Sequence, residues 1–334
     1  MKAAIVLYAG SISLQHQAHE IKSMLDTIET GFSSLEMWLF YQDSKPEVFP
    51  EIHSSLSSIK LIRIENVNSP ESYLQLLEHL MGQYPMDMLV FASDGLGQEL
   101  ASRLGYRLKG SSCLQVEACS LKSGKLEIIK PVYGNNLTAR FVLESFPCCL
   151  SVAKQVFCPV KMIPCESVSI EECELGQTQP FWVKETQTIC DEQSSGLSDA
   201  DLVIVAGQGV NNKETMDVLQ GIANTMGAKL GASRPVVMNA WIDMNRLIGA
   251  SGLIISPKIC IAAGVSGTGV FSAGIKNSAF IVAINIDNKA PIFQMADVGI
   301  VGDLLEFLLE LEKVIKADNK KKGRDDMAGS RIET

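Results

Sequence analysis

Four short stretches rich in small residues lie in the second half of this 334-residue chain, each next to an apolar run. They are AGQGVNN (206–212), GASRP (231–235), IGASG (248–252) and GVSGTGVFSAG (264–274). Glycine-rich loops often bind phosphate groups, because their backbone N–H groups can approach an anion without obstruction by a side chain. Each motif is weak by itself, since Asn212 stands where a dinucleotide fingerprint beginning at Gly207 needs its third glycine. Together, the four loops favour one nucleotide-binding site.

Polar side chains in these loops indicate what such a site could bind. Arg234 is a cation in a loop of small residues, and it either faces a phosphate or flavin or lies on the surface in a salt bridge. Hydroxyl groups that can donate or accept hydrogen bonds come from Ser233, Ser251, Ser266 and Thr268. All four histidines precede residue 80, so no imidazole is available to activate these hydroxyls. The absence of a nucleophile–base pair argues against hydrolase chemistry.

Composition excludes several other classes of function. A formal net charge of -9 argues against a surface that follows the phosphates of a nucleic acid. The nine cysteines are irregularly spaced without a C-x-x-C pair, which indicates reduced thiols in a cytoplasmic protein rather than a metal site or disulfide scaffold. His16 and His19 have no third metal ligand nearby. No apolar run is long enough to span a membrane.

Alternating apolar and amphipathic segments predict the scaffold that positions the loops. The first half has predicted strands at 3–9, 36–41, 59–65 and 86–92 that alternate with helices, which indicates a parallel sheet with helices on both faces. Predicted strands joined by tight turns follow, and the polar segment 191–200 is expected to be a linker. The second half has predicted strands at 201–209, 253–257, 259–264 and 279–285, and predicted helices at 213–227 and 301–315. Since ligands bind beyond the carboxyl ends of parallel strands, the four loops are expected to form a single site.

The order of these motifs resembles that of electron transfer flavoprotein α subunits. GASRPVV, LIGASGLIISP and ICIAAGVSGTGVFSAGIKNS are followed by AIN-x-D-x-x-APIF-x-x-AD-x-G-x-VGDL (283–304), which is a long and family-specific block. The resemblance implies an α/β protein with an N-terminal parallel-sheet domain (1–193) that pairs with a β subunit. It also implies a Rossmann-like, doubly wound domain (194–315) that binds FAD. Residues 316–334 lack apolar anchors and are expected to be a solvated, disordered tail.

The resemblance further implies which residues bind the cofactor. Arg234 matches the arginine that lies against the isoalloxazine ring, and Ser251 keeps the hydroxyl that bonds flavin N5, in the IGxSG form typical of the anaerobic, carnitine-type branch. Asn285 and Asp303 match positions that hold the nucleotide half of FAD. The full set of expected FAD-binding residues is Ser233, Arg234, Gly249, Ala250, Ser251, Gly252, Ser266, Gly267, Thr268, Gly269, Val270, Phe271, Asn285 and Asp303. The expected role is electron transfer between a flavin dehydrogenase, such as an acyl-CoA dehydrogenase, and an acceptor.

The sequence departs from the family in the loop that would face the flavin. Where the family has SGAIQHLAG, this chain has SGTGVFSAG, so Val270 replaces a glutamine and Phe271 replaces the histidine that faces the flavin C2 carbonyl. Gln208 stands where the family has an arginine. A nearby cation stabilises an anionic reduced flavin, so these changes predict a flavin that is harder to reduce. The alternative is a degenerate, non-redox subunit that binds AMP or no nucleotide and acts as a scaffold.

Overall fold

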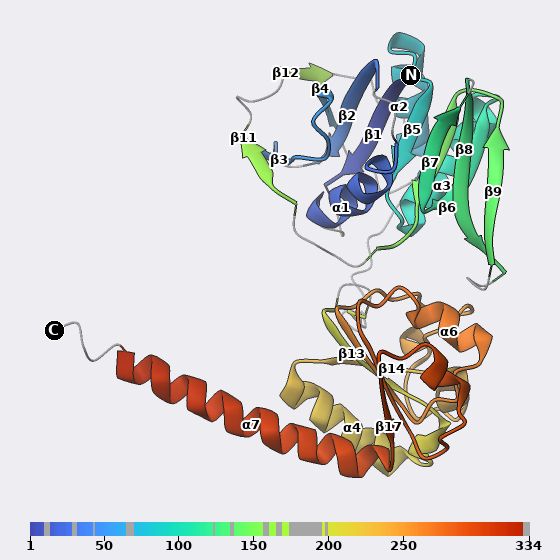
Figure 1. The fold of residues 1–334 in the computed structure, drawn as a ribbon. Helices are drawn as coiled ribbons and strands as arrows, with labels where there is room; N and C mark the ends of the chain where they lie inside the picture. The colour runs from blue at the N-terminus through green and yellow to red at the C-terminus, as the bar shows by residue number, and fades with distance from the viewer. Residues whose placement is uncertain are drawn as a thin grey trace, which may run out of the picture. The chain divides into compact units, whose positions relative to one another are not determined.

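The chain forms two compact units, Met1–Cys190 and Asp191–Thr334, in the computed structural model (Figure 1). The structure describes residues 1–9, 14–28, 32–42, 44–64, 70–122, 124–133, 137–155, 160–164, 169–173, 196–197 and 200–329. Most of the expected linker, and the predicted domain boundary after residue 193, lie outside the described residues.

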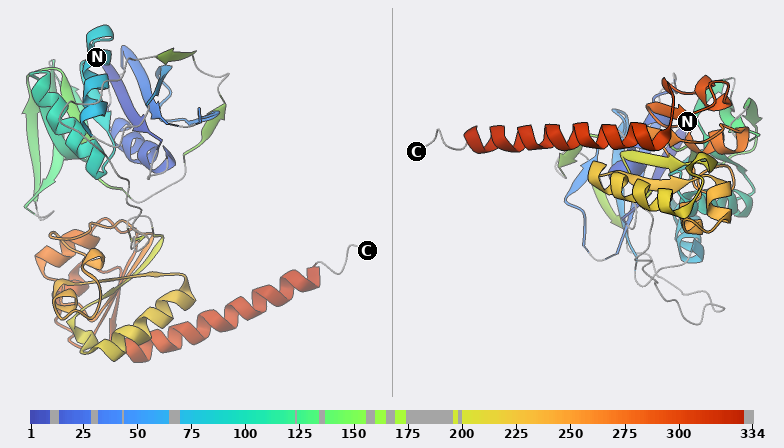
Figure 2. Two further views of the ribbon diagram at one scale, coloured as in Figure 1. Left: turned by 180° about the vertical axis from the view of Figure 1, so that it is seen from behind. Right: turned by 90° about the horizontal axis from the view of Figure 1, so that it is seen from below.

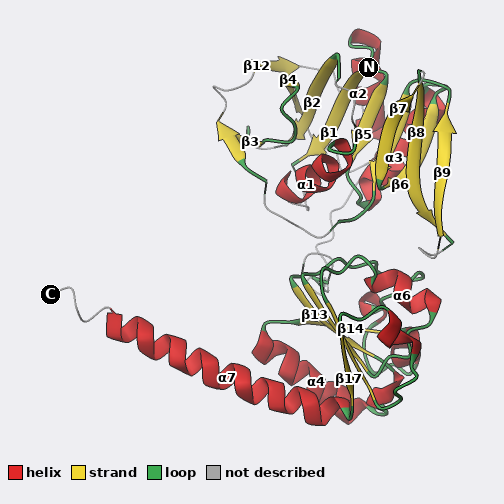
Figure 3. Ribbon diagram, in the orientation of Figure 1, coloured by secondary structure: helices red, strands yellow, loops and turns green. Residues whose placement is uncertain are grey.

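The first unit is built on a seven-stranded sheet in which all neighbouring strands are parallel (Figure 3). In spatial order the strands are β12 (Ser169–Cys173), β4 (Leu56–Arg63), β2 (Ser34–Tyr41), β1 (Lys2–Tyr8), β5 (Met88–Phe91), β10 (Cys148–Val152) and β6 (Ser111–Val116). Because both faces of the sheet are covered, its central strands are continuous apolar runs, as in AAIVLY of β1. The predicted parallel α/β sheet is confirmed.

Different elements cover the two faces of this sheet. Helix α1 (Leu14–Leu25) packs on one face, together with an antiparallel sheet of β7 (Ala118–Lys122), β8 (Lys125–Val132) and β9 (Leu137–Leu143). Helices α2 (Pro70–Gln83) and α3 (Gly95–Arg107) pack on the other face. The remaining strands, β3 (Val48–Pro50) and β11 (Met162–Pro164), form a two-stranded antiparallel ribbon.

The second unit has a five-stranded parallel sheet with the spatial order β14-β13-β15-β16-β17. Its strands are β13 (Leu202–Ala206), β14 (Lys229–Ala232), β15 (Ile259–Ala263), β16 (Ile281–Asn285) and β17 (Val298–Val301). From β13 the chain crosses through α4 (Lys213–Met226) to β14 on one side, whereas β15 to β17 extend on the other side. This reversal makes the sheet doubly wound, with its switch point between β13 and β15. The predicted Rossmann-like architecture is confirmed.

Helices lie on both faces of the second sheet. Helix α4, the short α5 (Arg234–Met238) and the first turns of α7 (Leu304–Gly329) share one apolar cluster with one face. Helix α6 (Gly269–Ile275) and the 3-10 helix η4 (Pro291–Gln294) pack on the other face. Two further 3-10 turns are η2 (Gln208–Val210) and η3 (Met244–Arg246). None of the helices in the described part of the chain is long and apolar enough to cross a membrane.

Two segments of the second unit differ from the expectation. The predicted strand at 253–257 is not a strand: only Leu253 forms an isolated bridge, and Ile255 instead donates its N–H to the carbonyl of Gly274 on α6. The burial of Ile255 over α6 therefore explains the apolar run without strand pairing. In place of the disorder expected from residue 316, α7 continues as a helix to Gly329 (Figure 2). Ion pairs one turn apart, such as that between Lys316 and Glu312, are of the kind that stabilises an exposed helix.

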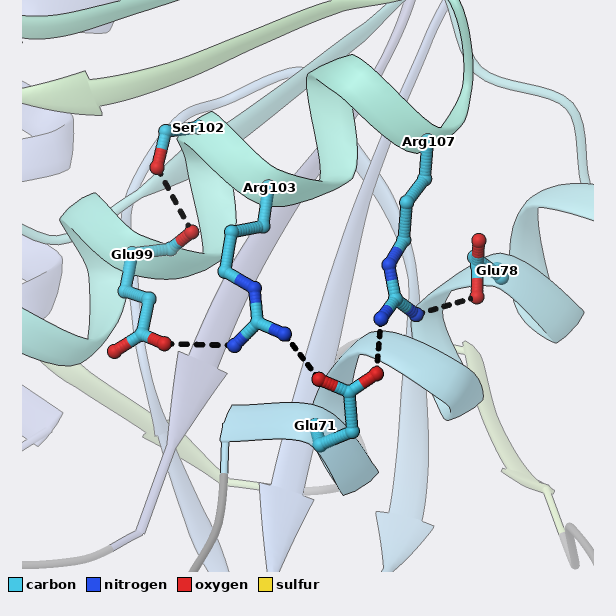
Figure 4. A network of polar contacts seen from close by, with 6 residues as sticks. All are labelled: Glu71, Glu78, Glu99, Ser102, Arg103 and Arg107. Atoms are coloured by element: carbon cyan, nitrogen blue, oxygen red, sulfur yellow. Dashed lines mark hydrogen bonds and ion pairs between the residues drawn. The ribbon is translucent and has the colours of Figure 1, made fainter. Parts of the chain in front are cut away.

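A network of ion pairs joins α2 to α3 in the first unit (Figure 4). Glu71 is 7% exposed, and its two carboxylate oxygens accept hydrogen bonds from Arg103 and Arg107. Glu99 and Glu78 pair with the outer edges of the same two arginines. Burial raises the pKa of the Glu71 carboxyl, but the hydrogen bonds and charges of the two arginines outweigh this and hold the pKa below its usual range.

We predict that Glu71→Gln destabilises the first unit by about 1.5–3 kcal/mol, because two arginines lose a buried, charged acceptor. Urea unfolding of the full chain measures this change. Glu99→Gln is the matched control, since its pair with Arg103 is exposed and contributes at most about 0.5 kcal/mol. Equal effects of the two substitutions would contradict the central role of Glu71.

The same network predicts a dependence of stability on pH. A carboxyl whose pKa is lower in the folded than in the unfolded state stabilises the fold above its unfolded pKa, which is about 4.3 for glutamate. This stabilisation is lost as the pH falls through the lower, folded pKa. The stability difference between the original chain and Glu71→Gln is therefore expected to be constant at neutral pH and to shrink in acid, as measured by urea unfolding at each pH.

Candidate functional site

A cavity of about 840 Å³ lies at the carboxyl ends of the strands in the second unit. Its volume falls within the range of roughly 300–1,000 Å³ that is usual for small-molecule sites. Its walls come from the segments that follow β13, β14, β15 and β16, so it opens at the switch point between β13 and β15. The lining residues are Gln208, Gly209, Ser233, Arg234, Pro235, Ile248, Gly249, Ala250, Ser251, Gly264, Val265, Ser266, Thr268, Val270, Phe271, Asn285, Ile286, Asp287, Ala290 and Pro291.

The structure brings most of the expected FAD-binding residues together around this cavity. Those that line it are Ser233, Arg234, Gly249, Ala250, Ser251, Ser266, Thr268, Val270, Phe271 and Asn285. Those that do not line it are Gly252, Gly267, Gly269 and Asp303. Gly252 closes a turn by donating its N–H to the carbonyl of Gly249, and Gly269 begins α6, so both belong to the backbone that supports the lining loops.

Asp303 has a local structural role. It precedes α7, and one carboxylate oxygen accepts the N–H groups of Leu305 and Glu306 at 2.9 and 3.0 Å. These are bonds of a helix N-cap, which satisfy amides that have no partner inside the helix. Asp303 does not line the cavity, so its position does not support the expected contact with the nucleotide half of the cofactor.

Glycines let the loops that flank the switch point meet backbone to backbone. A Cβ atom placed on Gly207 would lie 2.1 Å from the carbonyl oxygen of Gly264, and one on Gly209 would lie 3.0 Å from the Cα atom of Gly264. Two hydrogen bonds hold this contact, from Gly207 N–H to Ala263 and from Gly209 N–H to Gly264. Gly207, Gly209 and Gly264 thus serve the packing of the two loops against each other.

The loop at 248–252 is fastened to α6 by a backbone hydrogen bond. The N–H of Ala250 donates to the carbonyl of Val270 at 2.8 Å. Gly249 has a φ of 139°, and Gly274 packs so closely that a Cβ on it would lie 2.4 Å from the Gly249 nitrogen. The hydroxyl-bearing loop and the first turn of α6 therefore form one wall of the cavity.

Asn285 connects the segments that follow β15 and β16. Its amide nitrogen donates to the carbonyl of Val265 at 2.8 Å, and its amide oxygen accepts the N–H of Asp287 at 2.9 Å. A second connection runs from Ile292 N–H to the carbonyl of Ser266. Asn285 lines the cavity, and its bond to Val265 also helps to hold two lining segments in position.

Three side chains near the starts of α5 and α6 have polar groups that do not form helix-capping hydrogen bonds. Ser233 is 8% exposed and stands at the N-cap of α5, yet its hydroxyl does not bond the amides of that helix. Thr268 stands in the same way at the N-cap of α6. Arg234 is exposed and forms no ion pair with the residues that the structure describes, so the cost of burying an unpaired guanidinium does not arise. These groups are available to a ligand.

Val270 and Phe271, which depart from the family pattern in the loop at 264–274, lie in different environments. Val270 is 59% exposed at the edge of the cavity, whereas Phe271 is 7% exposed and belongs to an apolar cluster with Ile248 and Val265. Both side chains line the cavity without offering a hydrogen bond or a charge. This wall is consequently apolar.

Sequence reasoning did not include several lining residues among the site residues. Asp287 and Pro291 stand inside the quoted block 283–304, and Gly209 and Gly264 stand inside the quoted glycine loops. Their position directly after β13, β15 and β16 is the signal that could have identified them. Gln208, noted only as a departure from the family, also lines the cavity.

We predict that Gly267→Ala destabilises the second unit by at least about 2 kcal/mol, because an alanine is strained at a φ of +81° and its Cβ would lie 2.3 Å from the Ile292 nitrogen. Urea unfolding tests this prediction. Gly221→Ala on α4, where nothing lies within 4 Å of the added atom, is the control and should stabilise the unit by up to about 1 kcal/mol. A Gly267→Ala variant as stable as the control would disprove the close packing at this loop.

Comparison with known proteins identifies the family. The profile described as the electron transfer flavoprotein FAD-binding domain matches residues 196–276, which include the loops of the cavity up to α6. The profile described as the electron transfer flavoprotein domain matches residues 63–177 in the first unit.

Relatives that are named as electron transfer flavoprotein subunits agree with these matches. The chain is 35% identical over 249 residues to a putative electron transfer flavoprotein subunit, YgcQ, of Escherichia coli, covering 73% of this chain and 85% of that protein. It is 30% identical to the electron transfer flavoprotein subunit alpha of Bacillus subtilis, covering 75% of this chain and 77% of that protein. It is also 30% identical to the lactate dehydrogenase (NAD(+),ferredoxin) subunit LctC of Acetobacterium woodii, covering 77% of this chain but only 62% of that longer protein. Both units thus carry the sequence of one family, and the chain belongs to the electron transfer flavoproteins as an alpha-type subunit.

Proposed function

We propose that the cavity of the second unit binds FAD and that the chain is the alpha subunit of a heterodimeric electron carrier. In this role it passes electrons between a flavin dehydrogenase and an acceptor. The observation that carries the proposal is the convergence of Ser233, Arg234, Ser251 and Thr268 on one cavity at the switch point of a family FAD-binding domain.

The residues of the cavity fit such a cofactor. Gly209 and Gly264 both line the cavity, so a diphosphate can approach the main chain at these positions without meeting a Cβ atom. Arg234 supplies a cation, and Ser233 and Thr268 supply hydroxyls that are not engaged by their own helices. Bound FAD would supply the electron-transfer chemistry, and these side chains would bind and orient it.

A β-type subunit is the proposed partner. Relatives with aligned sequences over most of this chain are named as subunits, which supports an assembly of more than one chain. The first unit is proposed to pair with the β subunit, because the second unit holds the cofactor cavity. A flavin dehydrogenase such as an acyl-CoA dehydrogenase is the proposed electron donor.

A second candidate function is a scaffold that binds AMP or no nucleotide. The apolar wall formed by Val270 and Phe271 favours it, because that wall offers a flavin ring no polar contact. Gln208, in place of a cation, favours it as well.

The visible absorption spectrum of the purified complex distinguishes the two candidates. The full chain would be co-expressed with β-type electron transfer flavoprotein subunits from its own genome, and the complex purified without added cofactor. We expect a yellow complex whose flavin bleaches with dithionite. A stable complex without flavin, even after incubation with FAD, would overturn the electron-carrier function and support the scaffold.

We predict that Arg234→Gln lowers both the flavin content of the complex and the reduction potential of the flavin that remains, because the cavity loses its cation. Absorbance per protein and potentiometric titration measure the two effects. Lys258→Gln is the charge-matched control, since Lys258 precedes β15 at the opposite edge of the sheet and pairs with Asp201. An Arg234→Gln complex with unchanged flavin content and potential would remove Arg234 from the site.

A further inference from the structure

The antiparallel sheet β7-β8-β9 of the first unit has two edges with different surroundings (Figure 1). At the β7 edge, the N–H of Cys119 donates to the hydroxyl of Thr27, which follows α1, at 3.1 Å. At the other edge, β9 pairs with β8 alone in the described part of the unit, and no hydrogen bond there reaches the backbone groups on its outer side. Strand β9 therefore presents an edge of seven residues at which another strand can pair.

The apolar face of this sheet continues beyond the core of the unit. Cys119, Ile128 and Phe141 lie directly opposite one another on β7, β8 and β9, so their side chains share one face. Cys119 and Ile128 are buried in the core, whereas Phe141 is 44% exposed. Leu137, on the same face of β9, is 58% exposed. The core thus covers this apolar row on β7 and β8 but leaves it open on β9.

The opposite face of β9 carries a cation that is only partly neutralised. Arg140 and Lys122 lie 3.5 and 3.1 Å from the same carboxylate oxygen of Glu127. Two cations that share one carboxylate leave a local positive charge, on a chain whose net charge is -9. Val142, on the same face as Arg140, is 49% exposed. A strand that fits this edge is therefore expected to have an acidic side chain beside Arg140 and apolar side chains beside Phe141 and Val142.

We propose that β9 is the edge at which the β-type partner subunit adds an extended strand to the first unit. The inference rests on the proposed function, since it requires a β-type partner. Main-chain hydrogen bonds would hold the added strand, while the apolar side chains and Arg140 would select it. A second copy of this chain fits less well, because two β9 strands paired over their whole length, in either direction, place Arg140 beside Arg140.

Hydrogen–deuterium exchange tests the docking edge, with the full chain measured alone and in complex with β-type electron transfer flavoprotein subunits from its own genome. Amides on the outer side of β9 are expected to exchange readily in the chain alone and to be protected in the complex. A complex in which the exchange of Leu137–Leu143 is unchanged would overturn the inference and leave the proposed function intact. Protection of β9 in the chain alone that is lost on dilution would assign the edge to a second copy and also overturn it. Failure of every such subunit to bind would overturn both.

Two substitutions test the side chains of this edge. Val142→Lys places a charge against the added strand, and Arg140→Glu reverses the charge that selects it; each is expected to raise the dissociation constant of the complex at least about tenfold. Val218→Lys is the matched control for the first, since Val218 is 42% exposed on α4 of the second unit. Lys213→Glu, at the exposed start of the same helix, is the control for the second.

Isothermal titration calorimetry gives the dissociation constants, and far-ultraviolet circular dichroism of each chain alone shows whether its fold is kept. Both controls are expected to bind as the original chain does. If the two β9 variants fold and bind with unchanged constants, Arg140 and Val142 have no part in docking and the inference is wrong.

Discussion

The close contact between the loops after β13 and β15 is the constraint on which the cavity depends. At the switch point these loops leave neighbouring strands and meet backbone to backbone, at a separation that leaves no space for a side chain on Gly207. Because Gly209 and Gly264 have no side chains, their main-chain atoms line the cavity between the two loops. The hydroxyls and the guanidinium that line the cavity come from the segments after β14 and β15. The first of these segments is joined to the end of β13 by the hydrogen bond from Ser233 N–H to the carbonyl of Ala206.

The two units share a doubly wound topology but use its switch point differently. In the first unit the strand order places this junction between β1 and β5. There the Tyr8 hydroxyl donates to Asp94, and the Glu20 carboxylate accepts two hydrogen bonds from Ser93. Burial raises the pKa of Glu20 to about 7, although the bonds from Ser93 act in the opposite direction. Among the described residues at this junction, the carboxyl groups of Asp94 and Glu20 accept hydrogen bonds from Tyr8 and Ser93, and acidic groups oppose the binding of a phosphate. The corresponding junction of the second unit presents Arg234 and hydroxyl groups instead.

The sequence predicted the two sheets and most of the cavity, for a physical reason. Parallel strands buried on both faces leave long apolar runs, and loops in close contact leave glycines, so both features are visible in the chain itself. The run at 253–257 was misleading because an apolar segment buried against a helix has the same composition as a strand. The N-cap role of Asp303 was hidden because a match to a family motif does not reveal which hydrogen bonds a carboxylate makes. The exposure of Arg234 could not be predicted either, since it depends on where α5 begins relative to the cavity.

The bond between Ala250 N–H and the carbonyl of Val270 has a consequence for how this family can vary. The wall of the cavity is held by a main-chain oxygen, which every amino acid provides, and not by the side chain of residue 270. Substitutions at this position can therefore change the chemistry presented to a ligand without loosening the loop that carries Ser251. A scaffold of this kind separates the shape of a site from its electrostatics, so that evolution can adjust the second while the first stays constant.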